Sequence, residues 1–215
     1  MNLDLLKFEN ELWEKGIKHI AGVDEVGRGA LAGPLVVAAV IMDREPLRKS
    51  DVSLEEFPEY ADIKDSKLIS PNKRKKLADF IRNVAFSFSI VEIPHTHIDG
   101  KGIVSATQVG FHKAVKSLDK SPHHVLTDSF SIKLWPYKNQ TNIIRGDNKS
   151  ISIAAASIIA KVYRDDLMVR LHEENKKYQV YGFDRHKGYG TKFHREMIFM
   201  HGRSDIHRKS FRVRV

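Results

Sequence analysis

The sequence of 215 residues contains no cysteine. Disulfide frameworks, zinc sites built on thiolates and cysteine nucleophiles are therefore excluded. Long hydrophobic runs are also missing: the longest, residues 35–42, is too short to cross a membrane and has the length of a buried strand. The first residues lack the basic and then apolar pattern of a secretion signal. We therefore expect a cytoplasmic protein without a membrane-spanning segment.

Acidic residues are fewer than basic ones. Asp and Glu total 27 against 36 Lys and Arg, which gives a net charge of +9. A basic excess favours polyanionic partners such as nucleic acids, because each neutralised phosphate releases counterions. Hydrophobic residues make up 41% of the chain, enough for a folded core. The length suits one catalytic domain over residues 1–215, which we expect to be a monomer.

Strand and helix patterns alternate along the chain, which predicts an α/β fold. Apolar or alternating stretches predict strands at 19–26, 35–42, 85–93, 124–127 and 140–145. Helical periodicity or capping residues predict helices at 5–13, from Ser70-Pro71 onward, at 104–118, up to 174 and at 193–200. Either Asp147 or Ser150 caps the fourth of these helices. Residues 43–66 are predicted as loop, and about 172–215 as a C-terminal helical segment with substrate loops.

Four acidic residues have neighbours that suggest a site. Asp24 and Glu25 end an apolar strand before a glycine turn (Gly27-Arg28-Gly29), and Asp128 follows a short apolar stretch. Adjacent residues of a regular strand point to opposite faces, so the first two share a site only where the strand ends or bulges. Asp165 lies on the apolar stripe of the long helix, where a carboxylate needs an ion pair or a metal ion. A buried salt bridge to a nearby arginine is the alternative for Asp165.

Brought together, these carboxylates would repel one another strongly, and a divalent cation would remove that repulsion. Oxygen ligands without cysteine suit one or two Mg²⁺ or Mn²⁺ ions. Such a site activates water and stabilises the leaving oxygen in phosphodiester cleavage. The 11 histidines leave a zinc site as an alternative, although the sequence has no HExxH motif.

A resemblance to a known family begins at the glycine turn. The stretch GVDEVGRGALAGPLVVAAVI (22–41) resembles the opening strand pair of ribonuclease HII. Further stretches match the family in the same order: DSKLIS (65–70), VLTDS (125–129), RGDNKSISIAAASIIAKVYRD (145–165), YGFDRHKGYGTKFH (181–194) and IHRKSF (206–211). The DEVGRG and SIAAASIIAKVYRD blocks are specific, whereas DSK or IHRKSF alone would be weak.

The resemblance implies a ribonuclease-H-like fold, with a central mixed β-sheet flanked by helices and a C-terminal helical part. It implies a metal-dependent endonuclease of ribonucleotide excision repair that cleaves the RNA strand of RNA–DNA hybrids. Such an enzyme also cleaves 5′ of single ribonucleotides in duplex DNA and leaves 5′-phosphate and 3′-hydroxyl ends. The family's metal-site acids fall on Asp24, Glu25, Asp128 and Asp165. Asp165 is preferred to Asp166 because it matches the Arg-Asp pair that ends the family's helix block.

The resemblance also implies four substrate-binding residues, Gly27, Arg28, Gly29 and Tyr189. Lys67 and Lys187 are further candidates on their charge alone, with a solvated surface position as the alternative. The glycine turn would read the 2′-hydroxyl through its backbone, since only glycine allows so close an approach to a sugar, and the 2′-hydroxyl distinguishes RNA from DNA. The tyrosine would pack on the deoxyribose after the ribonucleotide. The two lysines and the arginine would hold phosphates.

The sequence departs from the family at Ser129, where glycine is usual, and at Ala30, where proline is common. Three alternatives stay open. A non-catalytic nucleic-acid-binding module is disfavoured by the four acids, which would repel DNA without metal. A DNA-only nuclease of the same fold is disfavoured by the glycine turn and Tyr189, because such an enzyme needs no reader of the 2′-hydroxyl. Ribonuclease HIII typically has an additional N-terminal domain and lacks the arginine of the glycine turn.

Overall fold

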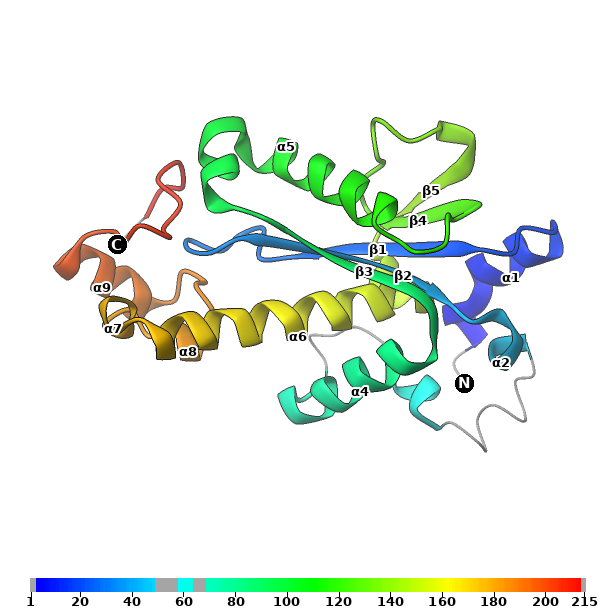
Figure 1. The fold of residues 1–215 in the computed structure, drawn as a ribbon, viewed down its shortest axis with the longest axis horizontal. Helices are drawn as coiled ribbons and strands as arrows, with labels where there is room; N and C mark the ends of the chain where they lie inside the picture. Colours follow the sequence, from blue (N-terminus) through cyan, green and yellow to red (C-terminus); the bar gives the residue numbers. More distant parts are fainter. Residues whose placement is uncertain (1–2, 49–57, 64–68, 214–215) are drawn as a thin grey trace.

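A mixed five-stranded sheet of order β3-β2-β1-β4-β5 forms the centre of the structure, a computed structural model that describes residues 3–48, 58–63 and 69–213 (Figure 1). The strands are β1 (Ile20–Val26), β2 (Leu35–Met42), β3 (Ala85–Ile93), β4 (His124–Asp128) and β5 (Gln140–Ile143). β1 pairs antiparallel with β2 and parallel with β4, and β5 continues the parallel part. The predicted mixed α/β sheet is confirmed.

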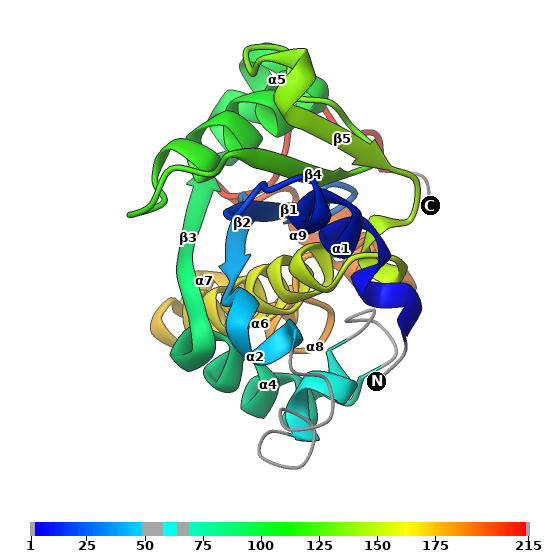
Figure 2. The same ribbon diagram turned by 90° about the vertical axis from the view of Figure 1, so that its right-hand side faces the viewer.

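Helices cover both faces of this sheet (Figures 1 and 2). α5 (His95–Lys116) lies on one face, and α6 (Ile151–Glu174) lies on the other with α4 (Pro71–Val84) beside it. The remaining helices are α1 (Lys7–Glu14), α2 (Arg44–Arg48), α7 (Lys176–Gln179), α8 (Phe183–His186) and α9 (Lys192–His201). The last three gather beyond one end of the sheet, near the β1–β2 turn (Figure 1). Within the described ranges, no helix is long and apolar enough to cross a membrane.

The apolar run of β2 reflects burial on both faces. Val36, Ala38 and Val40 belong to the core under α6 and α4. The intervening residues Val37 and Ala39 belong to the core under α5. A strand covered by helices on both sides needs apolar residues at every position, so it shows a continuous run instead of alternation.

α6 begins very close to β1. A Cβ atom on Gly22 would lie 2.0 Å from the backbone carbon of Ser152, so only glycine permits this approach. Ser150 caps the helix, since its Oγ accepts a hydrogen bond from the Ile153 N–H at 3.2 Å. Ser150 Oγ also donates to the buried carboxylate of Glu9 at 2.5 Å. The capping residue is therefore Ser150, and Asp147 lies in the preceding 3₁₀ turn η5 (Gly146–Asn148).

Several predicted boundaries were wrong. α5 starts at His95 instead of residue 104, and its two halves meet at Gly102, whose φ is 81°. The segment 43–66, predicted as loop, contains α2 and the 3₁₀ turn η2 (Pro58–Asp62), while 49–57 and 64–66 lie outside the described residues. The short helices α7 and α8 were missed because single turns have no detectable periodicity and depend on tertiary packing.

Candidate active site

Three acids, one buried and two half-buried, meet where the parallel strands end. β4 runs parallel to β1 with Thr127 opposite Val23, so the next residue, Asp128, comes beside Asp24. β4 ends at Asp128 whereas β1 continues to Val26, which leaves the last part of β1 without a neighbour on that side. Glu25 therefore reaches the same site as Asp24 although the two side chains leave opposite faces of the strand. All three acids line one cavity of about 440 Å³.

The pKa values of two of these acids are strongly raised. Burial raises the pKa of Asp24 to about 7, and the nearby charges of Asp128 and Asp147 act in the same direction, while a hydrogen bond from Ser157 opposes them. Burial and the charge of Asp24 raise the pKa of Glu25 to about 8. Among the described residues, nothing donates a hydrogen bond to the buried Oε2 of Glu25. Ionising all three acids in this poorly hydrated place therefore costs free energy unless a positive charge is supplied.

Asp147 was missed as a site residue. It is buried in η5, four residues after the end of β5, and it lies close enough to Asp24 to raise the pKa of that carboxyl. The Gly146 N–H next to it donates to Asp128 Oδ1 at 2.8 Å. β1, β4 and β5 run in the same direction, so their carboxyl ends share one edge of the sheet. An acid just after the third parallel strand was the available signal, but the sequence suggested only a helix cap.

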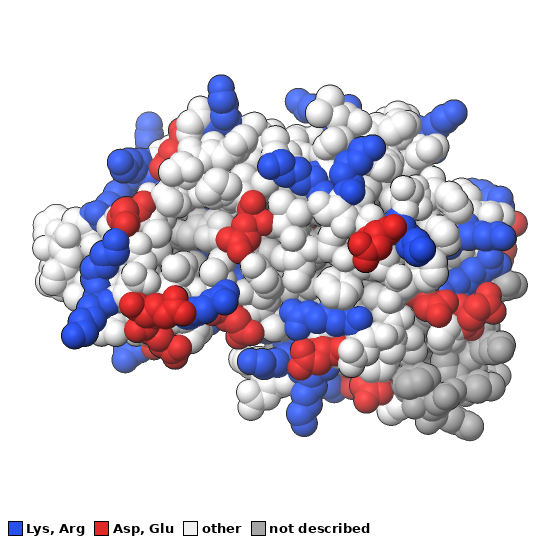
Figure 3. Space-filling view, viewed as in Figure 1, with Lys and Arg blue, Asp and Glu red and all other residues white. Residues whose placement is uncertain are grey.

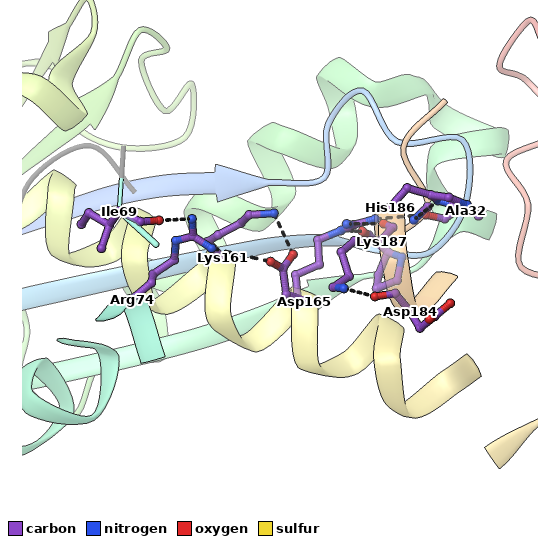
Figure 4. Close-up of polar contacts among 11 residues, drawn as sticks. Ala32, Ile69, Arg74, Lys161, Asp165, Asp184, His186 and Lys187 are labelled. Atoms are coloured by element: carbon purple, nitrogen blue, oxygen red, sulfur yellow. Dashed lines mark hydrogen bonds and ion pairs between the residues drawn. The ribbon is translucent and has the colours of Figure 1, made fainter. Parts of the chain in front are cut away.

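The structure does not bring Asp165 into this cavity. Asp165 lines an adjacent cavity of about 530 Å³. Its Oδ1 accepts a hydrogen bond from Lys161 Nζ at 2.7 Å, and its Oδ2 lies 3.9 Å from Arg74 Nη1 (Figure 4). The ion-pair alternative thus describes Asp165 better than membership of a four-acid cluster.

The helical-stripe argument for Asp165 failed for a physical reason. The stripe assumes that α6 buries one constant face, but beyond the sheet the helix packs against α8 and the β1–β2 turn. There Arg164 takes the core position, with 0% exposure, while the side chain of Asp165 keeps 20%. The buried residue is therefore Arg164, next to the predicted Asp165.

Two further residues connect the cavities. Lys161 and Tyr189 line both of them, and Lys161 Nζ lies 5.6 Å from the centre of the tyrosine ring. Arg164 lies under the same ring at 5.3 Å. Tyr189 is half-buried, so its ring forms part of the wall between the two cavities. Lys161 and Ser157 were not recognised from sequence, because a lysine or a serine on an apolar helix carries no motif of its own.

The glycine turn borders the acids, and its two glycines differ. Gly27 has a φ of 94°, and a Cβ there would lie 2.1 Å from Arg164 Nε. A Cβ on Gly29 would meet nothing within 4 Å, although Gly29 lines the first cavity. The Arg28 guanidinium lies 4.2 Å from the centre of the Phe130 ring, and 3.8 Å separate its Nη1 from Glu25 Oε1. Packing against Arg164 thus requires glycine at position 27, whereas open space lies beside Gly29.

The remaining predicted residues have separate outcomes. Lys67 lies outside the described residues. Lys187 lines the second cavity, but its Nζ donates to the Asp184 carbonyl (Figure 4). Ser129 has a φ of 61°, so it keeps the left-handed turn that glycine would adopt, and its N–H donates to the Ile143 carbonyl at 3.0 Å.

The acids of the first cavity fit a divalent cation in their chemistry. They supply oxygen atoms only, one of them without a hydrogen-bond partner among the described residues, and their mutual repulsion calls for a positive charge. Within the described ranges, no group of three or more His, Asp or Glu side chains is already arranged to hold a metal ion. The side chains of Asp24 and Glu25 would therefore have to turn toward a cation as it binds.

Comparisons with known proteins give a consistent result. The family model described as Ribonuclease HII matches residues 21–214. Ribonuclease HII of Acholeplasma laidlawii (strain PG-8A) is 44% identical over 211 residues, covering 98% of this chain and 96% of the relative. The crystal structure of ribonuclease H2 from Pyrococcus horikoshii OT3 superposes with a TM-score of 0.70 at 25% identity, covering 91% of this chain and 94% of that one. A structure of Bst-RNase HIII in complex with Mn²⁺ shares the fold, with a TM-score of 0.65 at 21% identity, covering 90% of this chain and 67% of that one.

Proposed function

The chain belongs to the ribonuclease HII family, and from this premise we propose a metal-dependent endonuclease that also cleaves at single ribonucleotides embedded in duplex DNA. Ribonuclease H activity on RNA–DNA hybrids is the activity of the family. The finer proposal is cleavage 5′ of the ribonucleotide, leaving 5′-phosphate and 3′-hydroxyl ends. One observation carries it: a single cavity is lined by three acids, the glycine turn and Tyr189.

The metal ligands we propose are Asp24, Glu25, Asp128 and, as the fourth acid, Asp147. Asp147 is preferred to Asp165 because its charge acts on Asp24, whereas Asp165 is paired with Lys161. Mg²⁺ or Mn²⁺ bound there, as one ion or two, would acidify a water molecule and offset the charge of the leaving oxygen. Mn²⁺ is present in the complex of the ribonuclease HIII that shares this fold.

The chain's own residues orient the acids and the substrate. Asp128 Oδ1 is held by the Gly146 N–H at 2.8 Å and by Ser129 Oγ at 3.1 Å, which fixes the direction of the carboxylate. The open space beside Gly29 admits a sugar edge to the turn, where the backbone can read a 2′-hydroxyl. The ring of Tyr189 then offers an apolar surface to the next sugar.

The second cavity offers a path for the phosphates. It is lined by five cations, Arg74, Lys75, Lys161, Arg185 and Lys187, against the two acids Asp165 and Asp166. On the face drawn in Figure 3, Lys and Arg alternate with Asp and Glu over the surface instead of forming one large patch. Local cationic cavities beside the acids are therefore better candidates for backbone contacts than the net charge of the whole chain.

Cleavage of a duplex with one embedded ribonucleotide tests the proposal. We expect one cut 5′ of the ribonucleotide with Mg²⁺ or Mn²⁺, none with a chelator, and none in the matching all-DNA duplex. End-labelled products should carry 5′-phosphate and 3′-hydroxyl ends. Binding without cleavage under all metal conditions would instead favour a non-catalytic nucleic-acid-binding module.

The identity of the fourth acid is tested separately by two asparagine variants. Asp147→Asn should lower kcat at least a hundredfold and weaken Mn²⁺ binding in calorimetry, because it removes charge from the acid cluster. Asp165→Asn should retain Mn²⁺ binding, since its carboxylate belongs to the adjacent cavity. Asp166→Asn, one residue further and mostly exposed, is the control. The reverse order of the first two variants would restore Asp165 as the ligand.

A further inference from the structure

A buried arginine, Arg164, holds the β1–β2 turn (residues 27–34), which contains the glycine turn, from α6. Its side chain is 0% exposed, and its guanidinium donates three hydrogen bonds to backbone carbonyls. Nε donates to Pro34 O at 3.0 Å and Nη2 to Ala32 O at 3.0 Å, both in the β1–β2 turn. Nη1 donates to Lys187 O at 2.8 Å, in the loop that carries Tyr189. One side chain thus connects the β1–β2 turn, which carries the proposed sugar reader, with the loop that carries the proposed stacking ring.

A second buried arginine, Arg208, holds the same turn from the C-terminal segment. It belongs to the IHRKSF stretch, to which the proposed mechanism gives no role, and it is 1% exposed. Its Nε donates to Gly33 O at 3.0 Å and its Nη1 to Arg28 O at 2.9 Å. Its backbone N–H donates to Leu31 O at 2.8 Å. The turn is therefore held by the C-terminal segment as well as by α6.

This arrangement is costly for a purely structural contact. Among the described residues, neither guanidinium forms an ion pair with a carboxylate, and Arg208 Nη2 has no hydrogen-bond partner. Burial lowers the pKa of Arg208 to about 9, and the charge of Arg164 adds to the effect. Two like charges that no carboxylate contacts directly in a protein interior oppose folding, although Asp165 and Asp99 lie near enough to favour the charged forms, and apolar side chains could fill the same volume. Their position under the turn suggests a role in substrate reading.

The hydrogen bond from Arg208 acts on the peptide that faces the cavity. The Arg28 carbonyl and the Gly29 N–H belong to the same peptide unit, so fixing the carbonyl fixes the direction of the N–H. A carbonyl that accepts from a cation also makes its N–H a stronger donor, because hydrogen bonds in a chain polarise one another. In the part of the chain that the structure describes, nothing accepts a hydrogen bond from the Gly29 N–H, and Gly29 lines the cavity.

We propose that Arg208 and Arg164 are positioning residues for ribonucleotide recognition. Arg208 holds the Arg28–Gly29 peptide with its N–H toward the 2′-hydroxyl of the substrate, and Arg164 fixes the distance from this peptide to Tyr189. The inference rests on the proposed function, since it assigns the parts that hold the sugar reader in place.

Lysine variants test the role, because lysine keeps the charge but cannot donate to two or three carbonyls in the fixed directions of a guanidinium. For Arg208→Lys and Arg164→Lys we expect kcat/KM on the single-ribonucleotide duplex to fall at least tenfold more than on a continuous RNA–DNA hybrid. A hybrid offers many 2′-hydroxyls, so it depends less on one reader. The loss should be mainly in KM, and Mn²⁺ binding should be unchanged.

Arg203→Lys is the matched control. Arg203 donates to the carbonyls of Arg208, Lys209 and Phe211, so it holds the same segment without touching the turn. Its substrate ratio should stay within twofold of the wild type. Equal ratios in the wild type, Arg208→Lys and Arg164→Lys would overturn the inference. An equal shift of the substrate ratio in Arg203→Lys would also overturn it, because the effect would then come from general loosening of the C-terminal segment.

A measurement on the wild type covers the case in which the lysine variants do not fold. Amide hydrogen exchange at Gly29, followed by NMR without metal at duplex concentrations that saturate binding in fluorescence anisotropy, should slow with the single-ribonucleotide duplex and stay unchanged with the all-DNA duplex. An unprotected Gly29 amide would refute the inference while leaving cleavage intact. A wild type that fails to cleave the ribonucleotide duplex would instead contradict the proposed function itself.

Discussion

Replacement of Gly27 by alanine should unfold the turn locally and destabilise the protein. The new Cβ would lie 2.1 Å from Arg164 Nε and 2.7 Å from its Cδ and Cζ, distances that real Cβ atoms do not show. Arg164 cannot move aside freely, since its guanidinium is bonded to three carbonyls. The φ of 94° adds backbone strain for any residue with a side chain.

The magnitude follows from these two contributions. A positive φ costs a residue with a Cβ about 1–2 kcal/mol. The loss of one hydrogen bond from a buried charged group costs about 1.5–3 kcal/mol. For Gly27→Ala we therefore expect the free energy of unfolding to fall by about 2.5–5 kcal/mol, measured by urea denaturation monitored by tryptophan fluorescence.

Gly29→Ala is the matched variant two residues away. Its Cβ would meet nothing within 4 Å, and its φ is not positive, so the free energy of unfolding should change by less than about 0.5 kcal/mol. The added methyl group would enter the space proposed for the sugar, so cleavage of the single-ribonucleotide duplex should fall about tenfold to a hundredfold. Gly27→Ala should thus lower the stability, whereas Gly29→Ala should lower the activity at nearly unchanged stability.

Two results would refute this reasoning. A Gly27→Ala protein as stable as the wild type would show that Arg164 does not pack tightly under the turn. A Gly29→Ala protein with wild-type cleavage would show that the substrate does not approach the turn at that residue. The all-DNA duplex and the hybrid serve as substrate controls in both cases.

Three further predictions concern stability. Ser129→Gly should raise the free energy of unfolding by roughly 0.5–1 kcal/mol in urea titrations, because glycine adopts the φ of 61° without strain; a decrease would contradict this. Ser150→Ala should lower it by about 2 kcal/mol, through loss of the helix cap and of the bond to Glu9, and an unchanged midpoint would argue against both contacts. Burial lowers the pKa values of His194 and His207 to about 4, so both stay neutral in the fold while the unfolded chain takes up protons below about 6.5. The contribution of the two histidines to stability should therefore be complete above pH 6.5 and fall toward pH 4, by up to about 1.4 kcal/mol per pH unit for each, whereas the raised pKa values of Asp24 and Glu25 act in the opposite direction. The difference in free energy of unfolding between the wild type and His194→Phe/His207→Leu, measured by denaturation at each pH, isolates the histidine contribution and should change by this amount between pH 6.5 and 4; a constant difference would contradict it.

The strands were predictable because their patterns reflect local burial. The run at residues 35–42 and the alternation at 85–93 coincide with β2 and β3, since a buried strand and a half-buried strand each leave a direct record in hydrophobicity. Ser70 and Pro71 marked the start of α4, since capping needs only neighbours along the chain. The start of α5 was missed because Gly102 interrupts its periodicity.

The site was predictable only in part. Asp24, Glu25 and Asp128 follow apolar strands, and the structure brings them into one cavity. The structure leaves the fourth predicted acid, Asp165, outside this cavity, because a helical wheel assumes one buried face along the whole of α6. Contact with α8 and the β1–β2 turn buries Arg164 and leaves Asp165 to its ion pairs.

The sequence by itself determined the fold class, the family resemblance and the acids at the ends of β1 and β4, because periodicity and motifs depend on residues close together in the chain. Only the tertiary structure decided that Asp147 lies near Asp24, because that depends on the parallel register of β1, β4 and β5. It also decided that Arg164 and Arg208 meet under one turn, because their bonds to it join residues more than a hundred positions apart in the chain.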